Sequence, residues 1–255
     1  MPAKTHLFPC RSDNFGVLLH DPDNGATASI DAPEAAAVEK ALQETGWKLT
    51  DILVTHHHAD HTDGIMALKD KYKCRVVAPA AEAKKIPGVD ETVKEGDKVT
   101  VGKLTGNVIE TPGHTLGHIA YWFHGDHLAF VGDTLFSIGC GRVIEGTMDQ
   151  MWASLKKLRD LPNDTLIYCG HEYTAANIKF ALSVDKNNPV LQARDAQVRQ
   201  QLAEGEPTVP TTIGDEKLAN PFLRADNADL ASYIGVAGKP ANEVFAEIRT
   251  RKNNF

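Results

Sequence analysis

The densest group of potential metal ligands in this chain lies between positions 55 and 61, in the run Thr-His-His-His-Ala-Asp-His. The run directly follows a short apolar segment that is predicted to be a buried strand. Residues two apart in an extended segment point the same way, so His56, His58 and Asp60 could converge, with His61 adjacent. A solvated histidine turn or a tag remnant fits less well, because a tag would be terminal and would lack Asp60. We therefore interpret the run as a metal-binding motif.

Three more potential ligands follow apolar runs farther along the chain. They are His114, Asp133 and His171, and each comes immediately after a glycine. Glycine allows the backbone to turn sharply, and open α/β sheets place their sites beyond the ends of strands. One such ending is weak evidence, because a single histidine or aspartate there could be an ordinary turn residue. Three of them, together with the histidine cluster, indicate one shared site.

Seven ligands exceed the need of one tetrahedral zinc ion, so we expect two divalent transition-metal ions per chain. The hypothesis assigns one ion to His56, His58 and His114, the other to Asp60, His61 and His171, and a bridging role to Asp133. Two ions about 3.5–4 Å apart share a water whose pKa falls toward 7, which makes it a nucleophile. Asp60 and Asp133 are thus the predicted catalytic carboxylates. Zinc is the expected metal, and these ligands also accept iron or manganese.

The elements that must position these ligands change in character along the chain. Short strands are predicted at 17–19, 28–30, 52–54, 75–77, 108–109, 120–123, 128–131 and 166–168. Helices are predicted at 34–45, ending at Gly46, and after a capping box at 147–150. From about 173 strands vanish, helices are predicted at 175–183, 190–204 and 241–252, and 206–223 is predicted to be loop-rich. The fold class is α/β (α+β), with a mixed domain over 1–172 and a helical domain over 173–255.

Composition places this pattern in an ordinary globular protein. Hydrophobic residues make up 42% of the 255 residues and charged residues 24%. A net charge of −7 without basic runs argues against a nucleic-acid partner or an anionic membrane surface. Four scattered cysteines, Cys140 and Cys169 among them, are expected to be reduced, buried thiols. No signal-peptide or transmembrane pattern is visible, so we expect a cytoplasmic protein. We also expect it to act as a monomer.

Several motifs together resemble a known family. The histidine run, T-P-G-H-T-x-G-H at 111–118, G-D-T-L-F at 132–136 and C-G-H-E-Y at 169–173 are similar to those of the metallo-β-lactamase superfamily. With G-C-G-R, H-E-Y-T, N-P-F-L-R and the basic tail, they resemble glyoxalase II, the hydroxyacylglutathione hydrolases. The resemblance implies an αβ/βα four-layer sandwich with a C-terminal helical domain, and the ligand assignment above. It also implies hydrolysis of S-lactoylglutathione to lactate and glutathione, in methylglyoxal detoxification.

The same resemblance implies roles outside the metal ligands. Asp31 would hydrogen-bond the metal ligands, although a plain turn residue is the alternative. Tyr173 would contact the glutathione backbone, and Arg249 with Lys252 would bind its glycine carboxylate. From the pattern alone, these two cations would only complement the dipole of the last helix. Arg142 stands where many members have Lys and would keep a positive charge near the substrate.

One departure from the family concerns Ile144, which stands where many members have Tyr and removes a hydroxyl contact. Glutathione binding would change there, and the hydrolytic chemistry would not. A thioester suits the predicted site, because a thiolate with a pKa near 8.5 leaves with little help from an acid.

Four other functions share some of these features. A phosphodiesterase or nuclease of the superfamily would be expected to carry a basic surface, and a β-lactamase would normally act outside the cytoplasm. A mononuclear iron persulfide dioxygenase would use one metal position only and would lack the long helical tail. A non-catalytic metal-binding domain would not need an open binuclear centre.

Overall fold

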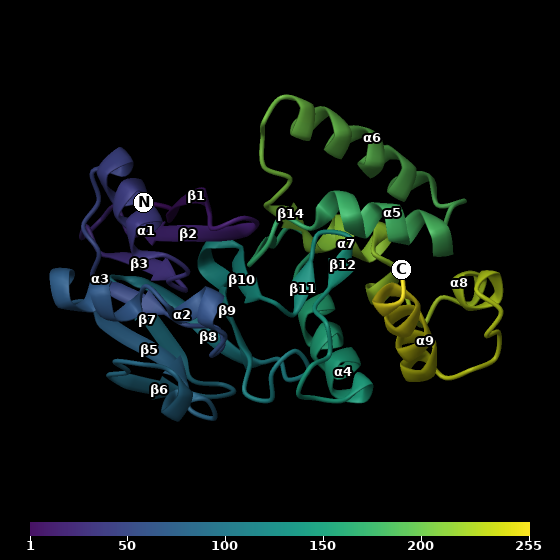
Figure 1. Ribbon diagram of the computed structural model, residues 1–255, viewed down its shortest axis with the longest axis horizontal. Helices are drawn as coiled ribbons and strands as arrows, with labels where there is room; N and C mark the ends of the chain where they lie inside the picture. Colours follow the sequence, from purple (N-terminus) through teal and green to yellow (C-terminus); the bar gives the residue numbers. More distant parts are fainter. The chain divides into compact units, whose positions relative to one another are not determined.

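The computed structural model describes residues 1–255, and the chain forms two compact units (Figure 1). The first consists of Met1–Glu110 and Thr115–Gly132, and the second of Thr111–His114 and Asp133–Phe255. The short segment Thr111–His114 therefore belongs to the second unit, although the chain on both sides of it belongs to the first. Each unit carries part of the predicted ligand set.

A six-stranded sheet in the first unit follows the order of the chain, β1 to β6. Its strands are β1 (Lys4–Cys10), β2 (Asn14–His20), β3 (Thr27–Ile30), β4 (Asp51–Leu53), β5 (Arg75–Pro79) and β6 (Glu91–Val93). The first three pair antiparallel, and β3 to β6 pair parallel. Parallel strands require crossover connections, which here include the helices α1 (Ala35–Thr45) and α3 (Ile65–Tyr72).

These two helices bury their apolar sides against the same sheet. Val38 and Leu42 of α1 and Leu68 of α3 share one core cluster with Ile52 of β4 and Val76 of β5. Helix α1 ends as predicted at Gly46, which has a left-handed φ of 72°. The short helices α2 (Ala59–Thr62) and η1 (Ala83–Lys85) lie in the connections after β4 and β5. The strand that leads to the histidine run is thus packed into a hydrophobic core formed by the sheet and these helices.

A second set of strands in the first unit is wholly antiparallel. It consists of β7 (Lys98–Val101), β8 (Leu104–Glu110), β9 (Ile119–Phe123) and β10 (Leu128–Gly132), with the turn η2 (His124–Asp126) before β10. The side chains of Tyr121, Phe123 and Phe130 are completely buried. All eight predicted strands are present in the chain, although β4 ends one residue earlier than predicted.

The second unit is mainly helical. Its helices are α4 (Met148–Arg159), α5 (Thr174–Val184), α6 (Pro189–Ala203), α7 (Ile213–Ala219), η3 (Pro221–Leu223), α8 (Ala228–Tyr233) and α9 (Ala241–Asn253). Its strands are β11 (Leu135–Phe136), β12 (Gly139–Cys140), β13 (Leu166–Cys169) and β14 (Thr211–Thr212). The predicted capping box opens α4, with Thr147 accepting from the Gln150 amide. Phe245 of α9 stacks on Trp152 of α4 and meets Phe222 of η3 edge-on, so these three rings join the three helices.

Three details of the second unit differ from the prediction. The stretch 206–223 is not merely loop-rich, because it contains α7, whose first turn is capped by Thr212. Three prolines masked this helix, but none lies inside it. In addition, strands do not vanish after 173, because β14 pairs with β13 over Thr211 and Thr212. Helix α8, capped by Asn227, was not predicted at all.

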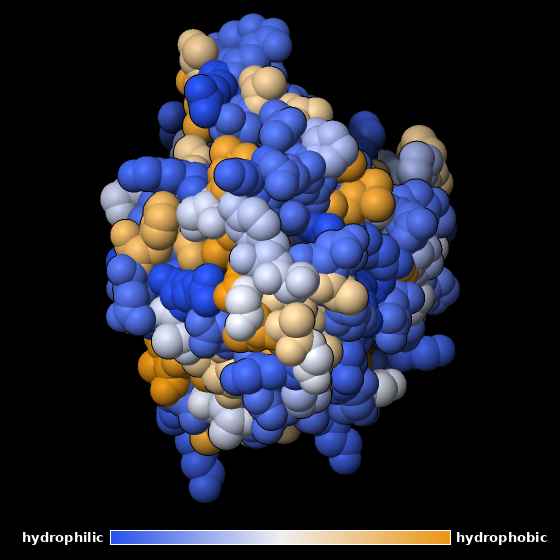
Figure 2. Space-filling view, turned by 90° about the vertical axis from the view of Figure 1, so that its right-hand side faces the viewer, coloured by the Kyte–Doolittle hydropathy of each residue, from blue (hydrophilic) through white to orange (hydrophobic).

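The outer surface fits the polar composition of the chain. Figure 2 shows a face on which hydrophilic side chains predominate and apolar ones lie scattered among them. None of the helices is both long enough and apolar enough to cross a membrane.

Candidate active site

The histidine run leaves the end of β4 in an extended conformation that lasts only to His58, whose φ and ψ are −60° and 145°. Helix α2 begins at Ala59, so Asp60 and His61 lie on a helical turn. The expectation that one extended alternation carries His56, His58 and Asp60 is therefore wrong for Asp60. Within this segment, Nε2 of His56 lies 3.1 Å from Nδ1 of His58. Nε2 of His61 lies 3.6 Å from a carboxylate oxygen of Asp60.

Asp31, just after β3, holds two parts of this segment. Its backbone adopts a left-handed φ of 57°. Its oxygens accept hydrogen bonds from the amide of Thr55 at 2.7 Å and from the Thr55 hydroxyl at 2.8 Å. Nδ1 of His61 lies 2.8 Å from the same carboxylate. A carboxylate can only accept, so His61 carries its proton on Nδ1, and its Nε2 has the lone pair that a metal requires.

The same reasoning assigns the proton of His56. Because the Thr55 hydroxyl donates to Asp31, it can accept from Nδ1 of His56, 3.0 Å away. Nε2 of His56 then presents its lone pair toward Nδ1 of His58. Two ligand nitrogens on one tetrahedral ion lie about 3.4 Å apart for metal–nitrogen bonds of 2.0–2.1 Å. The observed 3.1 Å is close to that value, so the pair fits a metal ion.

Sequence reasoning missed two residues that adjoin these ligands. The side-chain amide of Asn14 donates to the carbonyl of Asp60 at 3.1 Å and to its carboxylate at 3.2 Å. The ring of His118 is buried and lies 4.8 Å from the ring of His56, centre to centre. His118 ends the T-P-G-H-T-x-G-H motif, which was a usable signal. Nothing in the sequence around Asn14 points to Asp60.

In the second unit, Asp133 faces two histidines. One of its oxygens, Oδ2, lies 3.4 Å from Nε2 of His114 and 3.3 Å from Nε2 of His171. Nδ1 of His114 donates to the carbonyl oxygen of Arg142 at 2.8 Å, which leaves Nε2 available as a ligand. The ring of His171 stacks on that of Tyr173, with centres 4.7 Å apart and planes only 3° from parallel. Such fixed imidazoles are typical of metal ligands.

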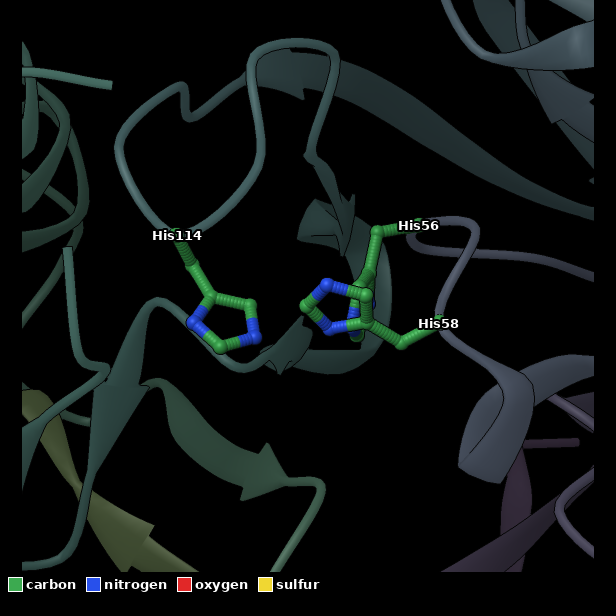
Figure 3. A group of neighbouring side chains, drawn as sticks. All are labelled: His56, His58 and His114. Atoms are coloured by element: carbon green, nitrogen blue, oxygen red, sulfur yellow. The ribbon is translucent and has the colours of Figure 1, made fainter. Parts of the chain in front are cut away.

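Two groups of potential ligand atoms contain six of the seven predicted metal ligands. The atoms of His56, His58 and His114 all lie within 4.8 Å of one another, and Figure 3 shows these three rings turned toward a common space. The atoms of Asp60, His61 and His171 do the same. Imidazole nitrogens and carboxylate oxygens suit zinc, iron and manganese, so the donor set fits divalent transition-metal ions.

The exposure of the ligands differs in a way that matters for access. His56, His61, His114, Asp133 and His171 are buried. The side chain of Asp60, by contrast, is 37% exposed, and His58 is partly exposed. A catalytic metal position needs an open side for water and substrate, and these two proposed ligands are the ones that solvent reaches.

The two basic residues of α9 have different surroundings. Arg249 is buried, with Nη1 donating to the carbonyl oxygen of Cys140 at 2.9 Å and the guanidinium lying 5.2 Å from the Phe222 ring centre. Lys252 is half-buried and donates to the carbonyl of Ala176 at 3.0 Å. Burial lowers the pKa of Lys252, and the charge of Arg249 lowers it further. Lys252 is thus the more accessible of the two cations.

The remaining predicted residues are easily placed. Arg142 and Ile144 have exposed side chains in the segment after β12. Cys140 and Cys169 are buried free thiols, as predicted. Burial raises the pKa of Cys140 to about 11 and that of Cys169 to about 12, so neither is a thiolate nucleophile near neutral pH.

Comparison with known proteins agrees with this geometry. Residues 23–171 match the model of the metallo-β-lactamase superfamily, and residues 172–255 match that of the hydroxyacylglutathione hydrolase C-terminus. A hydroxyacylglutathione hydrolase of Rhodopseudomonas palustris strain BisB5 is 59% identical over 254 residues, covering 100% of both chains. One from Nitrobacter winogradskyi is 58% identical over 253 residues, covering 99% of each.

Solved structures show the same fold. ETHE1 from Myxococcus xanthus has a TM-score of 0.70 at 29% identity, over 99% of this chain and 92% of its own. The BLEG-1 B3 metallo-β-lactamase has a TM-score of 0.65 at 23% identity, over 86% of this chain and 99% of its own. The predicted metallo-β-lactamase fold with a C-terminal helical region is thereby confirmed. The match of full-length relatives and of the C-terminal model also favours one branch of the superfamily: the chain belongs to the hydroxyacylglutathione hydrolase family.

Proposed function

We propose that this enzyme hydrolyses S-acylglutathione thioesters, with S-lactoylglutathione as the substrate and lactate and glutathione as the products. The observation that carries the proposal is the pair of ligand groups, His56 with His58 and His114, and Asp60 with His61 and His171, in a chain that matches the hydrolase family from end to end. We further propose zinc as the metal, a cytoplasmic monomer as the working form, and methylglyoxal detoxification as the setting.

The residues of the chain divide the chemical work between them. Asp133 faces His114 and His171 with one carboxylate oxygen and would bridge two ions. Two divalent ions, when bound, would supply Lewis acidity at the thioester carbonyl and lower the pKa of a shared water. Asp31 and the carbonyl of Arg142 hold the protons of His61 and His114 away from the ligand nitrogens. The open side at Asp60 and His58 would admit the substrate.

The glutathione part of the substrate would be bound by the second unit. We propose that 1–172 carries the metals and that 173–255 contributes to glutathione binding through Tyr173, Arg249 and Lys252. Arg142 is a further proposed substrate-binding residue. The accessible ammonium of Lys252 is suited to a carboxylate. Arg249, because it is buried and already donates to Cys140, would act mainly by shaping that region.

A direct assay tests the proposal. Purified protein loaded with zinc should hydrolyse S-lactoylglutathione, lose the activity to a chelator and regain it on zinc addition. Parallel assays with a nucleotide diester, glutathione persulfide and a β-lactam should give rates at least a hundredfold lower. A higher rate with any of these substrates would contradict the proposed specificity.

A further inference from the structure

Glu82 is a buried carboxylate for which the chemistry above has no use. It lies between β5 and the turn η1, where its neighbours along the chain, Ala81 and Ala83, are at most partly covered, yet Glu82 itself is only 3% exposed. Burying a carboxylate is costly unless several donors satisfy it. The donors around Glu82 therefore show what its burial achieves.

Both oxygens of Glu82 bind loops that contain or adjoin metal ligands. Oε2 accepts the backbone amide of His57 at 2.8 Å and lies 2.8 Å from Nδ1 of the same residue. Oε1 accepts the backbone amide of Gly117 at 2.8 Å. His57 lies between the ligands His56 and His58, so two contacts fix both its backbone and its ring.

The second loop approaches Glu82 so closely that only glycine fits. A Cβ atom at Gly117 would lie 2.6 Å from Cγ of Glu82 and 2.7 Å from Cβ of Ala81. Gly117 is followed by His118, whose ring stacks 4.8 Å from that of the ligand His56. One carboxylate thus connects the segment of His56 and His58 to the segment that packs against His56.

We propose that Glu82 is a positioning residue for the metal centre. By anchoring His57, which lies between the two proposed ligands, it holds the backbone on which His56 and His58 present Nε2 and Nδ1 at 3.1 Å. Preorganised ligands lose less conformational freedom on binding an ion, and loss of an orienting partner typically lowers metal affinity by about 10–100-fold. The proposal rests on the metal-binding part of the proposed function and does not depend on the substrate.

The test uses the full-length protein and zinc as the probe, with affinity measured by competition against a chromophoric chelator. In Glu82→Gln, the amide keeps one acceptor oxygen but turns an NH₂ group toward a backbone N–H. We expect the affinity for the most tightly bound zinc ion to fall about 10–100-fold in this variant. The absorption spectrum of the cobalt-substituted protein should change as well, because it reports ligand geometry.

Asp51→Asn is the matched control. Asp51 is also a buried carboxylate with a charged partner, Nε of Arg75 at 2.7 Å, but it begins β4, whereas the ligands follow the other end of that strand. We expect Asp51→Asn to lower the thermal unfolding temperature of the metal-free protein while leaving zinc affinity within about twofold of wild type. That contrast separates positioning from general stability.

Three results would overturn the proposal: wild-type zinc affinity in Glu82→Gln, an unchanged cobalt spectrum, or an equal loss of affinity in Asp51→Asn. If Glu82→Gln does not fold, His57→Ala decides, because it removes the ring contact with Glu82 and keeps the bond from the His57 backbone amide. A loss of several-fold supports the proposal, and no loss contradicts it. Failure of the wild type to hydrolyse S-lactoylglutathione would instead contradict the proposed function alone.

Discussion

Arg249 and Lys252, three positions apart on α9, should respond differently to removal. Family resemblance assigns both to the glutathione carboxylate, but only Lys252 is accessible. Arg249 is 5% exposed, donates to the Cys140 carbonyl and covers the Phe222 ring. We therefore predict that Arg249→Met lowers the free energy of unfolding, whereas Lys252→Met acts mainly on substrate binding.

The magnitudes follow from the contacts. Arg249→Met loses one charge-assisted hydrogen bond, about 1.5–3 kcal/mol, and a buried cation–π contact of about 1–2 kcal/mol, and methionine recovers part of the packing. A net loss of roughly 2–4 kcal/mol is expected. Lys252→Met should cost no more than about 1 kcal/mol of stability, because its hydrogen bond to Ala176 is exposed. Losing its charge should lower kcat/KM for S-lactoylglutathione by roughly 10–150-fold, mainly through KM.

Urea unfolding measures the free energy of unfolding of each variant. The contribution to substrate binding follows from comparing kcat/KM for S-lactoylglutathione with kcat/KM for a small thioester that lacks the glycine carboxylate. Raised salt should lower the kcat/KM of wild type toward that of Lys252→Met, because salt screens part of the attraction between Lys252 and the substrate. The reasoning would be refuted if Arg249→Met unfolded at the wild-type urea concentration. It would also be refuted if Lys252→Met lost rate equally on both thioesters.

Three further predictions concern the metals and one buried acid. Protein loaded with excess zinc and desalted should retain two ions per chain by elemental analysis; a reproducible value near one would exclude the binuclear centre. Asp133→Ala should abolish binding of the second ion, whereas His57→Ala should lower affinity only several-fold; the reverse order in the same chelator competition would refute the ligand assignment. Burial raises the pKa of Glu216 from 4.5 to about 7, so the folded state favours its neutral form and the resulting stability is lost as pH rises through about 7. The free energy of unfolding of Glu216→Gln, measured with urea relative to that of wild type, should therefore rise by up to roughly 3 kcal/mol between pH 4.5 and pH 8. If the difference between the two proteins were the same at both pH values, Glu216 would not titrate in this range.

The strand ends that carry the proposed ligands could be located from the sequence because they combine two local signals. An apolar run followed by glycine and then His114, Asp133 or His171 marks both the end of a strand and a residue type that is costly to bury without a partner. The end of helix α1 and the start of helix α4 could be predicted for the same reason, because Gly46 and the capping box are signals within one helical turn. The eight predicted strands required only short-range hydrophobicity.

What the sequence could not provide is long-range pairing. Asn14 contacts Asp60 from 46 positions away, and Glu82 contacts Gly117 from 35 positions away. Neither residue lies in a recognisable motif, and either could be an ordinary surface polar residue. The turn into α2 was missed because period-two alternation was extended past His58, where four helical residues leave too short a pattern to detect. Helix α7 was masked by flanking prolines that lie outside it.

The helical region and the ligand His114 are linked through one short turn. Backbone groups of the hairpin β11–β12 bind four buried side chains from later helices: Asn177 at Ser137, Glu216 at Ile138, Asn220 at Gly139 and Arg249 at Cys140. Two residues after that hairpin, the carbonyl of Arg142 accepts the Nδ1 proton of His114. Gly141, between them, is so close to Asp133 that a Cβ atom would overlap its carbonyl oxygen. Changes that loosen the later helices should therefore alter the orientation of His114 as well, which gives the buried Arg249 a structural role beside the substrate contact that the family resemblance implies.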